Sequence, residues 1–415
     1  MAEDPRRRRT PEQLAVLGAP AFGISLAYTV ATTYLPVLLA RLTGPGTTGV
    51  IVGGEGVLSL VVPVLIGAWS DAARSRMPFI QVAAVLAVAG MLVMPATTSS
   101  LVGLVVALGL FFLGYFVYHS PYYALFPDLV PDAQRGRSQG VQGALRSVGM
   151  LASLSAGGLL MEWWVPLPFA LGALAIAVTT WMLGRAIRRM PLHPHAVPRT
   201  SGGWLAELHL LRAAPGVRNW AVANALWETA VSSLRVFVVL YFTRGLGLTL
   251  AQVSGALALV GAAAVLAAPI SGRIADRYGH VPVMEVSLWI FGLGLLPAVF
   301  TTDTRFITAI IPVAFAAVVL LTLPYSVLMG LLPPQRSHGA GAGLYGVSRG
   351  VGLLLGPLLA GYAVEIFHSV PVLVFARTSG YSAVFAFTSV VLLASIPALR
   401  SLKAHETPRR KRHAA

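Results

Sequence analysis

Five charged residues lie inside long stretches of apolar sequence: Glu55, Arg146, Glu228, Arg235 and Arg349. A charge held in apolar surroundings costs several kcal/mol, so each is a candidate for function. A carboxylate in such a place can take up a proton from one side and release it to another. A guanidinium can hold an anion or a solute rich in hydrogen-bonding groups. These residues therefore indicate proton exchange and solute binding.

Glu228 is the first candidate for proton exchange. It lies in "NALWETAVSSLR", near the middle of the apolar stretch 219–243. Arg235 follows seven residues later, so in a helix it shares nearly the same face but lies about 10 Å along the axis. We expect no direct pairing between the two, and a shared polar stripe with Asn224 and Ser232. The alternative is a structural acid that a neighbouring helix satisfies.

Glu55 is flanked by glycines in "VGGEGVL", and Ser59 and Pro63 follow it at helical spacing on one face. Two interpretations stay open for this carboxylate: it titrates, or it pairs with an arginine of another helix. Glu285 and Glu365 lie near the ends of apolar stretches, where solvation is easy, and we expect structural roles for both.

The elements that must position these residues are membrane helices. Of the 415 residues 56% are hydrophobic and 11% charged, whereas soluble domains carry about a quarter charged residues. A helix needs about 20 apolar residues to cross a bilayer, and only helices and closed barrels satisfy their backbones there. The sequence predicts an all-α integral membrane protein with twelve transmembrane helices. They are expected over 14–40, 47–70, 77–95, 101–127, 139–161, 165–184, 219–243, 248–272, 281–300, 306–331, 342–366 and 378–399.

The distribution of positive charge predicts the orientation of these helices. If both termini lie in the cytoplasm, 23 of the 30 lysines and arginines fall in cytoplasmic segments and four in outer loops. Basic residues concentrate on the cytoplasmic side of membrane proteins. The net charge of +15 is therefore expected to reflect orientation and lipid contact, with no nucleic-acid partner.

The two halves of the chain repeat each other. Between 121–158 and 324–361, 203 residues later, 13 of 38 positions are identical without a gap. Arg146 and Arg349 are mates in this repeat, and so are Tyr122 and Tyr325. Parallel repeats of six helices characterise one transporter architecture. A short polar loop also occurs in each half, "GAWSDAARSR" at Gly67 and "GRIADRYGH" at Gly272.

This loop pattern, with the twelve spans and the repeat, resembles the signature of the major facilitator superfamily. The resemblance implies two six-helix bundles, 14–184 and 219–399, related by pseudo-two-fold symmetry and joined by a cytoplasmic linker, 185–218. Basic cytoplasmic tails, 1–13 and 400–415, are expected at the two ends. It also implies transport by alternating access around a central site. No enzymatic activity is expected, because no His/Asp metal cluster or Gly-x-Ser-x-Gly element lies within a span.

We expect the repeated loop to be a conformational latch, in which an aspartate accepts hydrogen bonds from arginines and from free helix amides. Its glycine would let neighbouring helices approach closely. The alternative is a plain cytoplasmic turn. The expected latch residues are Gly67, Asp71, Arg74, Arg76, Gly272, Asp276 and Arg277.

Within the superfamily, "PVLIGAWSDAARSRMPFI" and "SPYYALFPDLVPDAQRGRSQG" resemble the glycoside–pentoside–hexuronide and sucrose–proton symporters. This resemblance implies that Tyr123 stacks on a sugar ring and that Arg146 contacts the sugar. His119 stands where melibiose-type members have a sugar-binding acid, and it could instead carry a proton. The sodium-site acids of that group are absent, since Ser59 and Pro63 stand near those positions. If an ion is coupled, we therefore expect it to be the proton.

A second resemblance keeps export open as the alternative. Drug–proton antiporters carry spaced glycines in helix five, and both 140–158 and 343–361 contain a similar series. The same spacing also serves helix packing. Aromatic residues near the expected cavity, Trp227 and Tyr325 among them, could stack on a solute.

The sequence thus predicts a secondary active transporter, a proton-coupled symporter of a sugar-like small solute. The alternatives are a proton-coupled exporter of amphiphilic compounds and, from another class, a membrane sensor or scaffold that moves nothing. No cofactor or metal is expected. We expect a monomer in the lipid bilayer of the plasma (inner) membrane.

Overall fold

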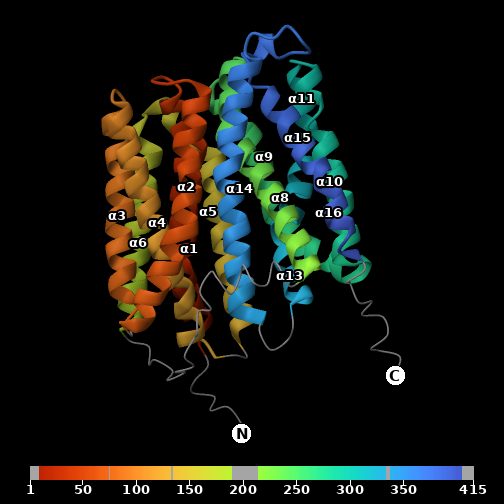
Figure 1. Cartoon of the computed structure of the whole chain (residues 1–415). Coiled ribbons are helices and arrows are strands. Elements are labelled where there is room, and N and C mark those ends of the chain that lie inside the picture. Colours follow the sequence, from red (N-terminus) through yellow and green to blue (C-terminus); the bar gives the residue numbers. More distant parts are fainter. Residues whose placement is uncertain (1–8, 74, 132–133, 189–213, 333–336, 404–415) are drawn as a thin grey trace. The chain divides into compact units, whose positions relative to one another are not determined.

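The computed structural model of the chain is helical (Figure 1). It describes residues 9–73, 75–131, 134–188, 214–332 and 337–403, and no β-strand occurs in these ranges. Twelve of its helical segments are long and apolar enough to cross a membrane. The prediction of an all-α membrane protein with twelve spans is confirmed.

The helices of the first half begin and end within a few residues of the predicted stretches. They are α1 (Pro11–Leu39), α2 (Pro45–Ala72), α3 (Met77–Val93), α4 (Leu101–Leu129), α5 (Arg135–Trp163) and α6 (Pro166–Ile187). Those of the second half are α8 (Pro215–Leu240), α9 (Leu250–Tyr278), α10 (His280–Gly294), α11 (Pro297–Phe300), α12 (Ile310–Thr322), α13 (Pro324–Leu331), α14 (Ser337–Phe367), α15 (Ala383–Ala394) and α16 (Ile396–Arg400).

Local sequence explains where several of these helices begin. Thr10 caps α1 in a capping box with Gln13, because each residue's side chain accepts a hydrogen bond from the other's backbone N–H. Ser100 caps α4 by accepting from the amide of Gly103 at 3.1 Å. The first helix therefore starts at Pro11, three residues before the predicted start.

Three predicted spans are interrupted. The stretch 306–331 forms α12 and α13, which break at Leu323 because Pro324 has no amide to continue the helix. The stretch 281–300 divides into α10 and α11. In the stretch 378–399 the α-helix begins only at Ala383, and the stretch divides into α15 and α16. Before α15, Ser379 and Gly380 have positive φ of 51° and 80°, so no helix can pass through them.

The chain packs into two compact units, and the structure describes most of each. Unit 1 comprises Met1–Thr43, Leu58–Pro198 and Thr249–Gly261, and unit 2 comprises Gly44–Val57, Arg199–Leu248 and Ala262–Ala415. These units differ from the predicted six-helix boundaries. The first part of α2 packs in unit 2 and the first part of α9 packs in unit 1.

Inside unit 1, α1 packs against α5 and α6, and α3 packs against α4. Arg9, which lies in the predicted basic tail 1–13, is only 7% exposed. Its Nε donates to the carbonyl of Leu129 at 2.8 Å, and its backbone N–H donates to the Gln134 side chain at 2.7 Å. Burial lowers the pKa of the Arg9 guanidinium from its ordinary value. Arg9 therefore anchors the start of α1 to the end of α4.

Inside unit 2, α8 is the central helix. It packs against α14 and α15, and α10 packs against α12 and α15. Most of α8 is buried, including Asn224, Trp227 and Glu228. Buried polar side chains need hydrogen-bond partners within the protein. The buried polar residues of α8 must therefore find partners on the helices that pack against it.

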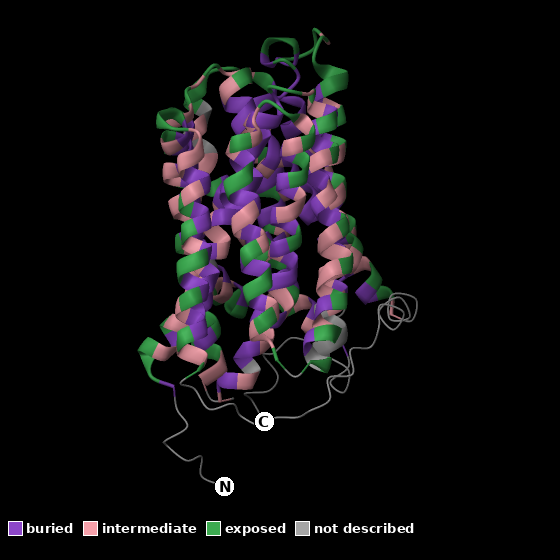
Figure 2. Ribbon diagram, turned by 90° about the vertical axis from the view of Figure 1, so that its left-hand side faces the viewer, coloured by how far each residue is buried: buried purple, intermediate pink, exposed green. Residues whose placement is uncertain are grey.

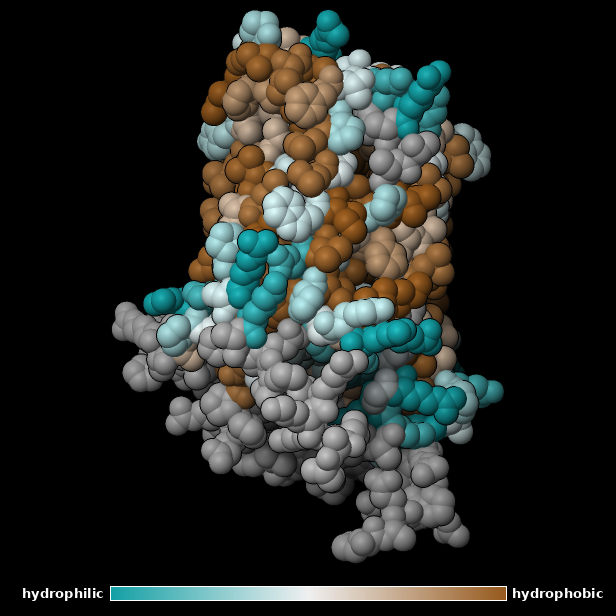
Figure 3. All heavy atoms as spheres, turned by 90° about the vertical axis from the view of Figure 1, so that its right-hand side faces the viewer, coloured by the Kyte–Doolittle hydropathy of each residue, from teal (hydrophilic) through white to brown (hydrophobic). Residues whose placement is uncertain are grey.

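The outer faces of the helices are apolar. Buried and exposed residues alternate at helical spacing along the helices in Figure 2. Apolar side chains cover much of the face in Figure 3, and hydrophilic ones gather toward its lower part. Exposed apolar side chains on α10 include Val286, Trp289 and Leu293, which are 41–58% exposed. An apolar surface of this extent requires lipid rather than water, so the chain is a multi-pass membrane protein.

Candidate functional site

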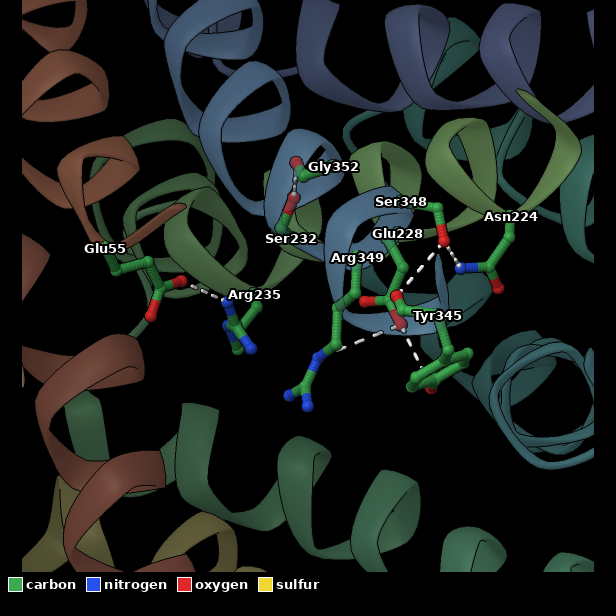
Figure 4. A network of polar contacts seen from close by, with 9 residues as sticks. All are labelled: Glu55, Asn224, Glu228, Ser232, Arg235, Tyr345, Ser348, Arg349 and Gly352. Atoms are coloured by element: carbon green, nitrogen blue, oxygen red, sulfur yellow. Dashed lines mark hydrogen bonds and ion pairs between the residues drawn. The ribbon is translucent and has the colours of Figure 1, made fainter. Parts of the chain in front are cut away.

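The centre of the candidate site is a buried carboxylate on α8. The Glu228 side chain is 8% exposed, and its Oε1 lies 3.9 Å from Nε of Arg349. The same oxygen accepts a hydrogen bond of 3.5 Å from the Tyr345 hydroxyl. Both partners lie on α14, one turn apart, and dashed lines mark their contacts with Glu228 in Figure 4. A guanidinium and a hydroxyl together stabilise a carboxylate that is largely shielded from water.

A second set of hydrogen bonds fixes these partners. Asn224 donates to the Ser348 hydroxyl at 2.8 Å, and Ser348 donates to the backbone carbonyl of Tyr345 at 3.1 Å. One turn beyond Glu228, Ser232 donates to the carbonyl of Gly352 at 2.9 Å. Of the predicted stripe, Asn224, Glu228 and Ser232 contact α14 (Figure 4). Arg235, its fourth member, contacts Glu55 of α2 instead.

Glycines of α14 make this close approach possible. A Cβ built at Gly352 would lie 2.8 Å from the amide nitrogen of Thr229 and 2.9 Å from the carbonyl oxygen of Ala225. At Gly356 a Cβ would lie 3.0 Å from the amide nitrogen of Ser233. Only glycine fits where two helix backbones come this near. The contact sets the register that places Arg349 beside Glu228.

Replacing Gly352 with alanine is therefore expected to lower the free energy of unfolding by about 2 kcal/mol, because the added methyl overpacks two backbones. Gly346 is the matched control on the same helix, since nothing lies within 4 Å of a Cβ built there. Thermal unfolding in detergent should show a clear loss for Gly352→Ala and none for Gly346→Ala. Equal melting temperatures for both variants would contradict this packing.

The second buried carboxylate of unit 2 is paired with an arginine. Glu55 of α2 is fully buried, and its Oε1 lies 2.5 Å from Nη2 of Arg235 of α8, whose side chain is 21% exposed. Glu55 is held near α8 because Gly53 and Gly56, on either side, lie against the backbone of α14. Of the two interpretations that the sequence left open, the structure shows the ion pair (Figure 4).

The two ion pairs are separate, as the seven-residue spacing on α8 predicts. Glu228 forms its ion pair with Arg349, and Arg235 forms one with Glu55. The predicted structural acids also have partners. Glu285 lies 2.7 Å from Arg400 Nε and 2.6 Å from the Lys403 ammonium.

In unit 1, the residues that the symporter resemblance singles out lie together. The rings of His119 and Tyr123 are 4.4 Å apart between centroids, one turn apart on α4. Arg146 of α5 donates to the Tyr123 hydroxyl at 3.5 Å, and the rest of its side chain is exposed. The structure thus brings an imidazole, a phenol ring and a guanidinium to one place, the combination that can bind a polar ring.

Two predicted binding residues have other surroundings. Trp227 is 1% exposed, and its indole N–H donates to the Ser395 hydroxyl at 2.8 Å. The structure therefore places Trp227 in the packing of unit 2 and not at an open surface. Tyr325 is 41% exposed, and its ring lies edge-on to that of Tyr345 at 5.7 Å. Tyr325 thus lies next to the partner of Glu228.

The expected latch is described only in part. Arg76 Nε lies 3.1 Å from an oxygen of Asp128 on α4, and Arg76 also donates to the Ser70 hydroxyl at 3.0 Å. The side chain of Asp71 and all of Arg74 lie outside the described residues.

In the second half of the chain, the expected latch residues face outward. Asp276 is exposed, and the guanidinium of Arg277 lies 5.4 Å above the Tyr278 ring. A methyl group would fit at Gly67 and at Gly272. Neither glycine is therefore needed for a close helix approach, contrary to the expectation.

Asp128 and Ser348 were not predicted from the sequence as members of these networks, and Tyr345 was expected only as an aromatic residue near the cavity. Asp128 lies in "FPDLVP" at the end of an apolar stretch, where an acid is a signal for a basic partner in a nearby loop. Ser348 precedes Arg349, and only the register of α14 against α8 shows that it meets Asn224. Among the described residues, no three His, Asp or Glu side chains gather as metal ligands do.

The chain is similar to known proteins in sequence and in fold. Residues 220–415 match the family model described as Major Facilitator Superfamily. No curated protein sequence matches the chain. A bacterial homologue of the human lysosomal transporter Spinster, solved inward-facing and unoccupied, has a TM-score of 0.79 at 16% identity, over 98% of this chain and 100% of that one.

Two further solved structures agree along nearly the whole chain. The nucleoside transporter NupG has a TM-score of 0.73 at 14% identity, over 94% of this chain and 98% of that one. A D-xylose–proton symporter has a TM-score of 0.70 at 14% identity, over 92% and 95%. With its twelve membrane-length helices and the family match over residues 220–415, the chain has the fold of the major facilitator superfamily transporters.

Proposed function

We propose that the chain is a secondary active transporter of the major facilitator superfamily that moves a small solute by alternating access. The observation that carries this proposal is the buried carboxylate of Glu228 in a membrane-spanning helix, in contact with Arg349 and Tyr345 of another span. A charge is kept at such depth for ion or substrate movement more often than for stability. The transporter fold is consistent with this use, and no enzymatic activity is proposed.

Proton coupling is part of the proposal. Glu228 can exist as a carboxylate beside Arg349 or as a neutral acid that hydrogen-bonds to Tyr345. A change in the distance to Arg349 would therefore change its proton affinity. Glu55 is less suited to this task, since it already pairs closely with Arg235 and is fully buried. His119, next to Tyr123, is the second candidate proton carrier, and no cofactor is invoked.

The solute is proposed to be sugar-like and the mode to be symport. Support comes from His119, Tyr123 and Arg146, which lie together in unit 1 as the glycoside–pentoside–hexuronide resemblance implies. The fold alone does not indicate which solute is carried, because the similar structures include a nucleoside transporter and a xylose–proton symporter. A ring that stacks on Tyr123 and accepts from Arg146 fits these side chains.

The glycine series that resembles drug–proton antiporters was the main support for the exporter alternative, and helix packing also accounts for it. Gly352 and Gly356, which belong to the antiporter-like glycine series, are required by the packing of α14 on α8. A packing role explains these glycines without export. A sensor or scaffold would need no buried carboxylate in contact with a partly exposed arginine, and Glu228 with Arg349 argues against it.

The proposed location is the plasma membrane of a bacterial-type cell, with the protein as a monomer and both termini in the cytoplasm. The support is the excess of basic residues in the segments that this orientation places inside.

Uptake by purified protein in proteoliposomes tests the function. Labelled sugars, glycosides and hexuronates are offered under an imposed inward proton gradient, with protein-free liposomes as the control. The proposal expects at least one of these solutes to accumulate and accumulation to collapse when a protonophore is added. Accumulation of amphiphilic drugs with an outward proton flow, and of no sugar, would support export instead.

A further inference from the structure

Two glutamates hold the first turns of two other helices in the same way. In unit 1, Oε2 of Glu162, near the end of α5, accepts a hydrogen bond of 2.8 Å from the backbone N–H of Ala251. In unit 2, Oε2 of Glu365, near the end of α14, accepts one of 3.2 Å from the backbone N–H of Gly46. Ala251 and Gly46 are each the second residue of their helix, α9 and α2. The first amides of a helix have no partner within it and carry partial positive charge, so a carboxylate stabilises them.

The two contacts are copies of each other in the internal repeat. Glu365 follows Glu162 by 203 residues, the shift that relates Arg146 to Arg349. Ala251 follows Gly46 by 205 residues, the shift that relates the two polar loops. Each contact joins a helix of one half of the sequence to a helix of the other half. The repeat has therefore kept the same carboxylate-to-helix contact twice, once inside each unit.

Close packing accompanies both contacts. A Cβ at Gly158 of α5 would overlap the carbonyl oxygen of Leu250, and the Gly158 amide donates to the Ser254 hydroxyl at 2.9 Å. A Cβ at Gly361 of α14, the repeat mate of Gly158, would lie 3.2 Å from the Cα of Gly46. Each glutamate thus stands one turn beyond a glycine that lets the two helices touch.

We propose that Glu162 and Glu365 are paired positioning residues that hold one face of the transporter closed. This inference rests on the proposed alternating access. Both contacts lie at the ends of α2 and α9 that are opposite the polar loops at Gly67 and Gly272, so the proposed orientation places them at the outer face. When the two halves of the sequence separate at that face, both hydrogen bonds must break. When the halves meet, both carboxylates return to the exposed amides.

The size of the effect follows from the position of the two groups. A carboxylate at an exposed helix N-terminus favours the contact by about two- to five-fold in an equilibrium constant. The two glutamates act at separate contacts, so their effects multiply, to at most about 25-fold when both are removed. An effect of this size shifts the equilibrium toward the closed state but still leaves the open state populated.

Distances between spin labels test the proposal directly. The chain has no cysteine, so pairs of introduced cysteines carry the labels. Val50 with Leu359 reports on the contact of α2 with α14, and Leu159 with Gly255 reports on that of α5 with α9. Val50, Leu159 and Leu359 are exposed, and nothing lies within 4 Å of a Cβ at Gly255. In nanodiscs without solute, Glu365→Ala and Glu162→Ala should each raise the long-distance population about two- to five-fold.

Matched variants separate positioning from a general loss of structure. Glu365→Gln and Glu162→Gln keep a side-chain oxygen that can accept the hydrogen bond, and should restore part of the short-distance population. Asp303→Ala is the control, because Asp303 also caps a helix, through the amide of Arg305 at 2.9 Å, but joins no two spans. Melting temperatures of the three alanine variants should be similar, because each variant loses one helix-capping contact.

Unchanged distances in the alanine variants, or an equal shift in Asp303→Ala, would overturn the assignment of the two glutamates. These measurements need no transported solute. If the parent protein transports solute but the alanine variants show no change in spin-label distances, only the proposed role of the two glutamates is contradicted. If the distances change but the protein moves no solute, only the proposed transport function is contradicted.

Discussion

Replacing Glu228 with glutamine is expected to abolish accumulation driven by a pH gradient while solute exchange continues. Glutamine keeps the size of the side chain and its hydrogen bond with Tyr345, but it cannot bind or release a proton. With one proton per solute, a gradient of one pH unit supports about a ten-fold accumulation, and the variant should fall to equal concentrations on both sides. Counterflow of labelled solute in proteoliposomes, with and without the gradient, measures both quantities.

Glu285 provides the control for that experiment. It is also an acid in a membrane-spanning helix, but it pairs with Arg400 and Lys403 near the end of its span. Glu285→Gln should keep gradient-driven accumulation. Full accumulation by Glu228→Gln would show that the coupling proton binds elsewhere, and His119→Gln would then be the next variant to measure.

Arg235→Met is expected to destabilise the protein by about 3–5 kcal/mol, because it leaves the fully buried Glu55 carboxylate without its ion pair. Removing both charges should be much less harmful, since the desolvation cost of the carboxylate disappears with it. The double variant Glu55→Gln, Arg235→Met should therefore recover most of the lost stability. Thermal unfolding of the four proteins of this cycle in detergent gives the coupling between the two residues.

Arg305→Met is the matched control for the stability cycle. Its side chain is 93% exposed, and Asp303 lies 4.0 Å away, so the pair is screened by water. Its melting temperature should remain that of the parent. If Arg235→Met were as stable as Arg305→Met, the Glu55–Arg235 pair would not be a buried charge contact.

The sequence was sufficient to predict the helices and their number, because an apolar stretch of membrane length has few other stable structures. The positions at which these helices are interrupted were harder to predict. Pro324 breaks the tenth predicted span, yet Pro63 lies inside an unbroken α2. The difference depends on neighbouring helices that can accommodate the missing hydrogen bond, and such neighbours are not visible in a single stretch of sequence.

The candidate site was predictable residue by residue but not in its pairings. Rarity of charge within apolar sequence identified Glu55, Glu228 and the three arginines. Which acid meets which arginine depends on the register of α8 against α14 and α2, and the glycine contacts at Gly352 and Gly56 fix that register. Trp227 shows the limit of reasoning by residue type, since its indole is used in packing.

The internal repeat extends beyond the stretch 121–158 and its mate 324–361. Beyond the identical pair Gly158 and Gly361, the next identity at the same shift is Glu162 with Glu365. Their role became visible only when the structure showed that each accepts from the first turn of another helix. A repeated acid near the end of a span is therefore a useful signal for a helix-capping contact.

Access to the solute site from both sides of the membrane tests the central claim most directly. Gly143 lies one turn before Arg146 on α5, and nothing lies within 4 Å of a Cβ built there, so Gly143→Cys places a single thiol beside the proposed site. Membrane-impermeant thiol reagents are then added to either face of oriented vesicles. The account predicts reaction from both faces, with rates that a pH gradient shifts in opposite directions. Reaction from one face only, under every gradient and with every solute, would contradict it.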